Sequence, residues 1–221
     1  MKESYFTIQA LEKQALELYQ QVADSSQKKA IPFQPQQSAL LVLDMQSYFL
    51  DAASHAYVPS ARAILDGVVQ LVKEYYTHGR PVFFTQHINT TRDAGMMSTW
   101  WKDLITDKHP LHGIVPEIDL SMGTLIKKSQ YDAFYQTSLD EKLDDKGVTQ
   151  VVICGVMTHL CCETTARSAF MHNFEVFFPV DGTATYRLEN HRASLLNLAH
   201  GFASVVLMND ILEAMRGGHG G

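Results

Sequence analysis

The segment that decides the fold is Gln150-Val151-Val152-Ile153-Cys154-Gly155-Val156-Met157-Thr158-His159-Leu160-Cys161. Its first half is a continuous apolar run, typical of a strand buried on both faces. The residues from Cys162 to Phe170 have a helix-like composition. A thiol where a strand turns into a helix lies near unpaired backbone N–H groups and the positive end of the helix dipole. The sequence therefore predicts that Cys161 is a nucleophile whose thiolate form is stabilised there.

Apolar runs of the same kind recur along the chain and alternate with helical periodicity. Strands are expected at 39–44, 81–85, 124–127, 151–154, 175–178 and 203–207. Helices are expected at 6–22, from about Ile64 to Gly79, and at 138–146, 162–170, 189–200 and 210–215. This alternation predicts a three-layer α/β/α, Rossmann-like fold. The sheet would hold about six mostly parallel strands, with helices on both faces and an additional N-terminal helix.

The chain of 221 residues fits one domain with a full hydrophobic core. We expect an N-terminal helical extension at 1–35, a main α/β domain at 36–215 and a flexible tail at 216–221. The segment 87–122 has no clear periodicity, which is more typical of a functional loop or lid than of a linker.

Charge and cysteine content exclude several classes of protein. The net charge of −6 gives no support for binding to nucleic acid or to an anionic membrane. No apolar run is long enough to span a bilayer, and residues 1–5 lack the apolar core of a signal peptide. Three cysteines, two of them adjacent, do not resemble a disulfide framework. A reducing cytoplasm is therefore the expected compartment.

A nucleotide-dependent oxidoreductase is a further class that the sequence disfavours. After Asp44 no glycine occurs until Gly67. Neither a Gly-x-Gly-x-x-Gly turn nor a phosphate-binding loop follows the first strand. We therefore expect an enzyme that uses no cofactor.

Groups capable of catalysis fall at the predicted strand ends: Asp44, either Lys127 or Lys128, and Cys161. Ligands bind at this edge in parallel sheets. Cys161 would attack an electrophilic carbonyl, and Asp44 would act as general base and then general acid. A lysine would orient the pair, and the backbone N–H groups of Met157 and Cys161 would receive the oxyanion. The structural alternative is that the aspartate caps a helix and that a cysteine is a small core residue. We interpret Cys154 and Cys162 as core residues of this kind.

Three motifs in order give the chain a specific resemblance. They are Asp44-Met45-Gln46-Ser47-Tyr48-Phe49, Lys128-Ser129-Gln130-Tyr131-Asp132-Ala133-Phe134 and Cys154-Gly155-Val156-Met157-Thr158-His159-Leu160-Cys161. Over residues 36–210 the chain resembles the isochorismatase-like superfamily of cysteine hydrolases. The resemblance implies an Asp44–Lys128–Cys161 triad and so selects Lys128 over Lys127. It also implies a cis peptide bond between Val156 and Met157, which would aim the Met157 N–H into the oxyanion hole.

The resemblance narrows the chemistry but leaves alternatives. Nicotinamidases of the superfamily bind a metal through an Asp-x-His pattern, and here Thr85-Gln86-His87 lacks the aspartate. His109 and His112 lie in a Pro-containing loop, so no catalytic metal is expected. The thiol favours hydrolysis of a small amide, ureide or carbamoyl C–N bond through a thioester. The alternatives are vinyl-ether hydrolysis by Asp44 and Lys128, as in isochorismatases that lack the cysteine, and a non-catalytic binding protein on the same fold.

The substrate pocket is the least determined part of the site. The partner is expected to be a small molecule, and the superfamily implies a homo-oligomer, either a dimer or a tetramer. His172 and His191 are interpreted as ordinary surface or capping residues. Core packing is the competing explanation for each aromatic pocket candidate. The candidate pocket residues are Phe49, His87, Trp100, Trp101, Tyr131, Phe134 and His159.

Overall fold

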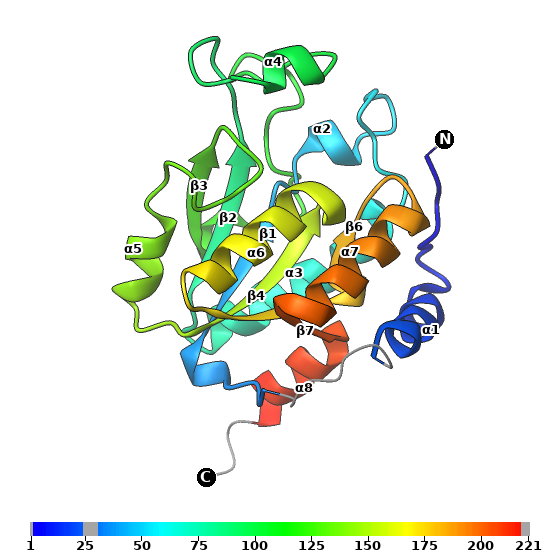
Figure 1. Ribbon diagram of the computed structural model, residues 1–221, viewed down its shortest axis with the longest axis vertical. Coiled ribbons are helices and arrows are strands. Elements are labelled where there is room, and N and C mark those ends of the chain that lie inside the picture. Colours follow the sequence, from blue (N-terminus) through cyan, green and yellow to red (C-terminus); the bar gives the residue numbers. More distant parts are fainter. Residues whose placement is uncertain (1, 24–30, 218–221) are drawn as a thin grey trace.

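A parallel sheet forms the middle layer of the protein (Figure 1). The computed structural model describes residues 2–23 and 31–217. The strand order is β3-β2-β1-β4-β5-β7, and the short β6 pairs with the end of β4. Every strand pairing is parallel, which confirms the predicted sheet and adds β6 to it. The strands are β1 (Ser38–Leu43), β2 (Val82–His87), β3 (Thr124–Lys128), β4 (Gln150–Val156), β5 (Glu175–Pro179), β6 (Thr183–Ala184) and β7 (Ala203–Val206).

Helices cover both faces of the sheet, as the sequence predicts (Figure 1). On one face α3 (Ala61–Thr77) packs against α8 (Met208–Gly217), and on the other α6 (Glu163–Met171) packs against α7 (Leu188–Gly201). The short α5 (Leu139–Asp144) precedes β4. The N-terminal α1 (Leu11–Ala23) lies against α7 and β7. Within the described ranges, no helix is long and apolar enough to cross a membrane.

Burial explains why the central strands are continuous apolar runs. Every residue of β1, β2 and β4 is buried. A strand covered by helices on both faces cannot place polar side chains on alternate positions. The edge strands differ, since β3 alternates between exposed and buried positions along its second half and all of β7 is half-buried.

The N-terminal helix begins later than predicted. The expected helix at 6–22 starts at Leu11, because Phe6 is fixed outside it. The Phe6 N–H donates to Ser60 Oγ at 3.1 Å, and the Phe6 ring packs on the ring of His191. At the other end of the chain, α8 includes Arg216 and Gly217 from the predicted tail. Residues 24–30 and 218–221 lie outside the described residues, so the boundaries at 35 and 215 stay predictions.

The long segment after β2 crosses the carboxyl edge of the sheet. It contains α4 (Met97–Trp100), which lies beyond the strand ends together with α2 (Ser47–Leu50) (Figure 1). Backbone hydrogen bonds hold its later part against the chain that follows β1. The Ser47 N–H donates to the Gly113 carbonyl at 2.9 Å, and the Val115 N–H donates to the Met45 carbonyl at 2.9 Å. The predicted lid segment is therefore tied to the end of β1.

Gly155 allows β4 to approach β1 closely at that same edge. Its φ is +117°, and a Cβ at this position would overlap the carbonyl oxygen of Leu43. We expect Gly155→Ala to lower the melting temperature by about 6–12 °C, corresponding to about 3 kcal/mol of strain. Gly79→Ala is the matched control, because Gly79 also has a positive φ but has no heavy atom within 4 Å of the place that a Cβ would occupy. We expect that control to shift the melting temperature by about 2–4 °C. Equal shifts in the two variants, measured by calorimetry, would contradict the close-approach explanation.

Candidate active site

Three strand ends bring the catalytic candidates to the same edge of the sheet. Asp44 directly follows β1, Lys128 is the last residue of β3, and Cys161 lies in a π-helical turn, Thr158–Cys162, just after β4. Because β2 lies between β1 and β3, the Lys128 side chain reaches across the end of β2 to meet Asp44. Lys127 is exposed, since successive side chains of a strand point to opposite faces.

Lys128 joins the other two groups. Its Nζ lies 2.8 Å from Asp44 Oδ2 and 3.4 Å from Cys161 Sγ. The third contact of the ammonium is the Gln130 carbonyl, at 2.9 Å. The side chains of Lys128 and Asp44 are both 0% exposed. The ammonium therefore forms an ion pair with a carboxylate and donates hydrogen bonds to a sulfur and a carbonyl oxygen.

Asp44 is held in one orientation by β2. The Thr85 hydroxyl donates to Oδ1 at 2.6 Å, and the Asp44 N–H donates to Thr85 Oγ1 at 3.2 Å. Asp44 has a φ of +52°, in the left-handed region that is uncommon for residues other than glycine. Within the described chain, Oδ2 accepts no hydrogen bond of good geometry, and its contact with Lys128 is an ion pair. This oxygen can therefore still accept a proton.

The buried ion pair determines the protonation states of the two charged groups. Burial is the largest single influence and favours a neutral Asp44, but the Lys128 ammonium, together with His87 and Cys161, outweighs it and lowers the pKa of Asp44 below its ordinary value. Burial is likewise the largest single influence on Lys128 and disfavours its ammonium, but Asp44 and Cys161 together outweigh it and raise the pKa of Lys128. Both groups are charged at neutral pH.

The pKa of the Cys161 thiol differs from the sequence-based expectation. Burial, followed by the negative charge of Asp44, raises the pKa of Cys161 to about 12, and the nearby Lys128 offsets this only in part. The prediction of a stabilised thiolate is therefore wrong for the resting site. Cys161 is only 6% exposed and lies near a carboxylate, and these two effects disfavour the thiolate more than the helix end favours it. The resting group is a thiol, which needs a base before it can attack.

The turn that carries Cys161 is fixed by buried hydrogen bonds. It follows the Val156–Met157 peptide bond, which is cis in the structure. Thr158 Oγ1 lies 2.8 Å from His191 Nδ1, and His191 Nε2 lies 3.1 Å from the Val180 carbonyl. Burial lowers the pKa of His191 to about 3, so the ring is neutral and donates from Nε2. His191 is completely buried, and its interpretation as a surface or capping residue is wrong.

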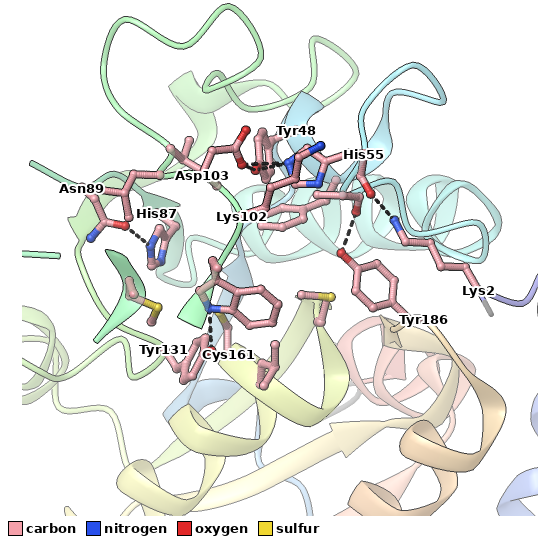
Figure 2. Close-up of a pocket in the computed structure, with 18 residues that line it drawn as sticks. Lys2, Tyr48, His55, His87, Asn89, Lys102, Asp103, Tyr131, Cys161 and Tyr186 are labelled. Carbon is pink, nitrogen blue, oxygen red and sulfur yellow. Dashed lines mark hydrogen bonds and ion pairs between the residues drawn. The ribbon is translucent and has the colours of Figure 1, made fainter. Parts of the chain in front are cut away.

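A cavity of about 240 Å³ opens next to Cys161 (Figure 2). Figure 2 shows Cys161 and Tyr131 on one side of it and Tyr48, His55 and Asp103 on the other. Of the predicted pocket residues, four line this cavity. They are Phe49, His87, Trp101 and Tyr131.

The other three predicted pocket residues lie elsewhere. Trp100 is 73% exposed at the end of α4. Phe134 is buried and stacks on His172, with ring centroids 4.8 Å apart, so core packing explains it. His159 is half-buried beside the cavity wall, where its Nδ1 lies 2.6 Å from Thr185 Oγ1. The prediction that these three residues line the pocket is therefore wrong.

Comparisons with known proteins identify the family of the chain. The model of the Isochorismatase domain matches residues 38–210. The chain belongs to the isochorismatase family. A protein named Nicotinamidase 3 from Arabidopsis thaliana is 40% identical over 185 residues, covering 81% of this chain and 89% of that protein.

Solved structures support the fold of the family. A cysteine hydrolase from Pseudomonas syringae pv. phaseolicola 1448A superposes with a TM-score of 0.82 at 23% identity, covering 87% of this chain and 100% of that one. The pyrazinamidase of Pyrococcus horikoshii, solved in complex with zinc, gives 0.70 at 24% identity over 77% of this chain and 99% of that one. The protein is therefore an isochorismatase-family hydrolase with the three-layer fold.

The residues near the triad do not fit a zinc ion. No group of three or more His, Cys, Asp or Glu side chains among residues 2–23 and 31–217 is arranged to hold a metal. His87 Nε2 is instead 2.8 Å from Asn89 Oδ1. His109 and His112 bond to the backbone of their own loop, since Nδ1 of His109 accepts from the Leu111 N–H and Nδ1 of His112 lies 2.6 Å from the His109 carbonyl.

A polar cluster that the sequence does not predict lies across the cavity from Cys161. The Tyr48 hydroxyl donates to Asp103 Oδ1 at 2.6 Å, and His55 Nε2 lies 2.8 Å from the same oxygen. The Trp101 indole N–H also donates to the Tyr131 hydroxyl, at 2.8 Å. These bonds tie the lid segment to both walls of the cavity. No local pattern could have revealed them, because Tyr48 and Asp103 are 55 residues apart.

The raised thiol pKa predicts how fast Cys161 reacts with a neutral alkylating reagent. We expect the rate of modification by iodoacetamide to rise about tenfold per pH unit from about pH 7 to about pH 10, because the thiolate fraction rises by that factor. Mass spectrometry of the peptide that contains Cys161 measures the rate. Cys161→Ser serves as the control and should remain unmodified, since Cys154 and Cys162 are fully buried. A rate that reaches a plateau below about pH 8 would contradict the thiol resting state.

Proposed function

We propose that this isochorismatase-family hydrolase cleaves a C–N bond of a small amide, ureide or carbamoyl compound through a thioester on Cys161. The observation that carries the proposal is the position of Lys128 Nζ, 2.8 Å from Asp44 Oδ2 and 3.4 Å from Cys161 Sγ. A thiol, a carboxylate and an ammonium thus meet beside a cavity open to a ligand. The 40% identity to a protein named as a nicotinamidase supports amide chemistry.

The first half of the proposed reaction forms the thioester. Cys161 Sγ attacks the carbonyl carbon while Asp44 Oδ2 takes the thiol proton. The carbonyl oxygen becomes an oxyanion, which the backbone N–H groups of Met157 and Cys161 would stabilise. Both residues line the cavity. Asp44 then returns the proton to the nitrogen as the C–N bond breaks, and ammonia or an amine leaves.

The second half releases the acid. A water molecule adds to the thioester carbonyl as Asp44 removes its proton. The C–S bond then breaks, and the proton from Asp44 restores the Cys161 thiol. Lys128 keeps its proton, because Asp44 and Cys161 raise its pKa more than burial lowers it. It would stabilise the negative charge that passes between oxygen and sulfur.

The walls of the cavity suit a small ligand with an apolar body. Phe49, Trp101, Tyr131 and Leu160 surround the opening to Cys161. Aromatic walls hold a planar ligand at low entropic cost, and a few polar groups then set its orientation. Such a pocket would present the carbonyl of an amide to the sulfur.

Compartment and assembly belong to the same proposal. All three cysteines are free, which suits a reducing cytoplasm. A dimer or tetramer would bury apolar side chains of the N-terminal region, where Ile8 and Leu16 are 65% and 44% exposed.

The test of function combines a substrate panel with variants of the triad. The panel contains nicotinamide, a carbamoyl amino acid, ureidoacrylate and isochorismate. On the best C–N substrate, we expect Cys161→Ala to lower kcat by about 10⁴-fold or more and Asp44→Asn by about 10²–10⁴-fold. Cys162→Ala is the matched control and should keep kcat near the wild-type value. Product formation and circular dichroism separate lost chemistry from lost folding.

The vinyl-ether alternative gives a different result in this test. If Cys161→Ala keeps full activity and isochorismate is the best substrate, then Asp44 and Lys128 catalyse without the thiol. That outcome would reject the thioester route.

A further inference from the structure

A segment that precedes the matched domain contributes to the wall of the cavity. Lys2 lines the cavity together with Cys161, although the family model begins at residue 38. Figure 2 shows Lys2 at the margin of the cavity, next to Tyr186 and the His55 carbonyl and apart from His87 and Asn89. The substrate pocket is thus not built from the family domain alone.

Specific contacts fix this N-terminal segment in place. The Glu3 N–H donates to the Tyr186 carbonyl at 2.7 Å, and the Tyr5 hydroxyl accepts from the Thr185 N–H at 2.9 Å. Thr185 Oγ1 in turn lies 2.6 Å from Nδ1 of His159, a residue of the turn that carries Cys161. Phe6 is 2% exposed. The segment is therefore a fixed part of the wall.

The Lys2 ammonium is positioned but lacks an anionic partner. Nζ donates to the His55 carbonyl at 2.5 Å and to the Tyr57 carbonyl at 2.8 Å, and it lies 4.3 Å from the centroid of the Tyr186 ring. Among the described side chains, no carboxylate forms an ion pair with it. An ammonium has three N–H groups, so one remains for a ligand.

The charges around the cavity favour an anion. Its lining contains Lys2 and Lys102 but a single acidic side chain, Asp103. The Asp103 carboxylate is already engaged by the Tyr48 hydroxyl and His55 Nε2. The lining is therefore more positive than the chain as a whole, which has a net charge of −6. Such a local potential attracts an anionic ligand.

We propose that Lys2 is a specificity-determining residue that binds a carboxylate of the substrate, remote from the bond that Cys161 cleaves. This inference rests on the proposed function and narrows its substrate to amides that carry an ionised acid group. The two backbone carbonyls and the Tyr186 ring hold the ammonium in place before the substrate arrives, so little side-chain entropy is lost on binding.

Two ligands that differ by one carboxylate test the proposal. They are benzamide and 3-carbamoylbenzoate, which present the same carboxamide to Cys161. Binding is measured by calorimetry in the Cys161→Ala background, where the thiol cannot react. We expect 3-carbamoylbenzoate to bind about tenfold more tightly than benzamide, the usual size of one charge-assisted contact. Adding Lys2→Met should remove this preference and leave the affinity for benzamide unchanged.

Matched variants separate the charge of Lys2 from its contribution to packing. Lys2→Arg keeps the charge and should keep most of the preference. Lys13→Met removes an exposed lysine of α1 and should leave both affinities unchanged. Melting temperatures of all the variants show whether the N-terminal segment remains folded.

The outcomes distinguish this inference from the proposed function. Equal affinities for the two ligands, a preference that survives Lys2→Met, or no binding of either ligand would overturn the role of Lys2. If wild-type protein still hydrolyses a neutral amide in those cases, the thioester function stands without it. If the carboxylate preference is found but no C–N bond is cleaved, the proposed function fails and the binding site stands.

Discussion

The buried ion pair between Asp44 and Lys128 is the constraint on which the site depends. Two charged groups with fully buried side chains have lost their hydration, and each is tolerable only because the other lies 2.8 Å away. The pair also explains the resting state of Cys161. The ammonium favours a thiolate and the carboxylate opposes it, and burial decides in favour of the thiol. The site therefore holds a neutral thiol and a charged carboxylate on the same ammonium.

The parallel sheet makes this pair possible. Asp44 follows β1 and Lys128 ends β3, on either side of β2. Their contact therefore requires the correct register of three strands and the correct side for the Lys128 side chain. Leu43 pairs with both Thr85 and Gly155, which sets Asp44 beside the Thr85 hydroxyl and next to the strand that leads to Cys161. A shift of one residue in β3 would exchange buried Lys128 for exposed Lys127.

The sequence predicts features that depend on local pattern. Continuous apolar runs predicted the buried strands, and strand ends together with three motifs predicted Asp44, Lys128 and Cys161 as the catalytic candidates. The structure brings those three side chains together. Features that depend on distant contacts were not predictable. Trp100 and Trp101 are adjacent in sequence, but only packing decides which of them faces the cavity. Tertiary burial likewise determines where α1 begins, where Lys2 lies and how high the pKa of the Cys161 thiol is.

A covalent acyl intermediate on Cys161 is what distinguishes the proposed thioester route from the vinyl-ether alternative. The most direct measurement is acid quenching within a single turnover of the best C–N substrate, followed by peptide mass spectrometry. We expect a mass increase equal to the acyl group on the peptide that contains Cys161, rising before the free acid and then decaying. Product formation with no adduct on Cys161, or with an adduct on another residue, would contradict it.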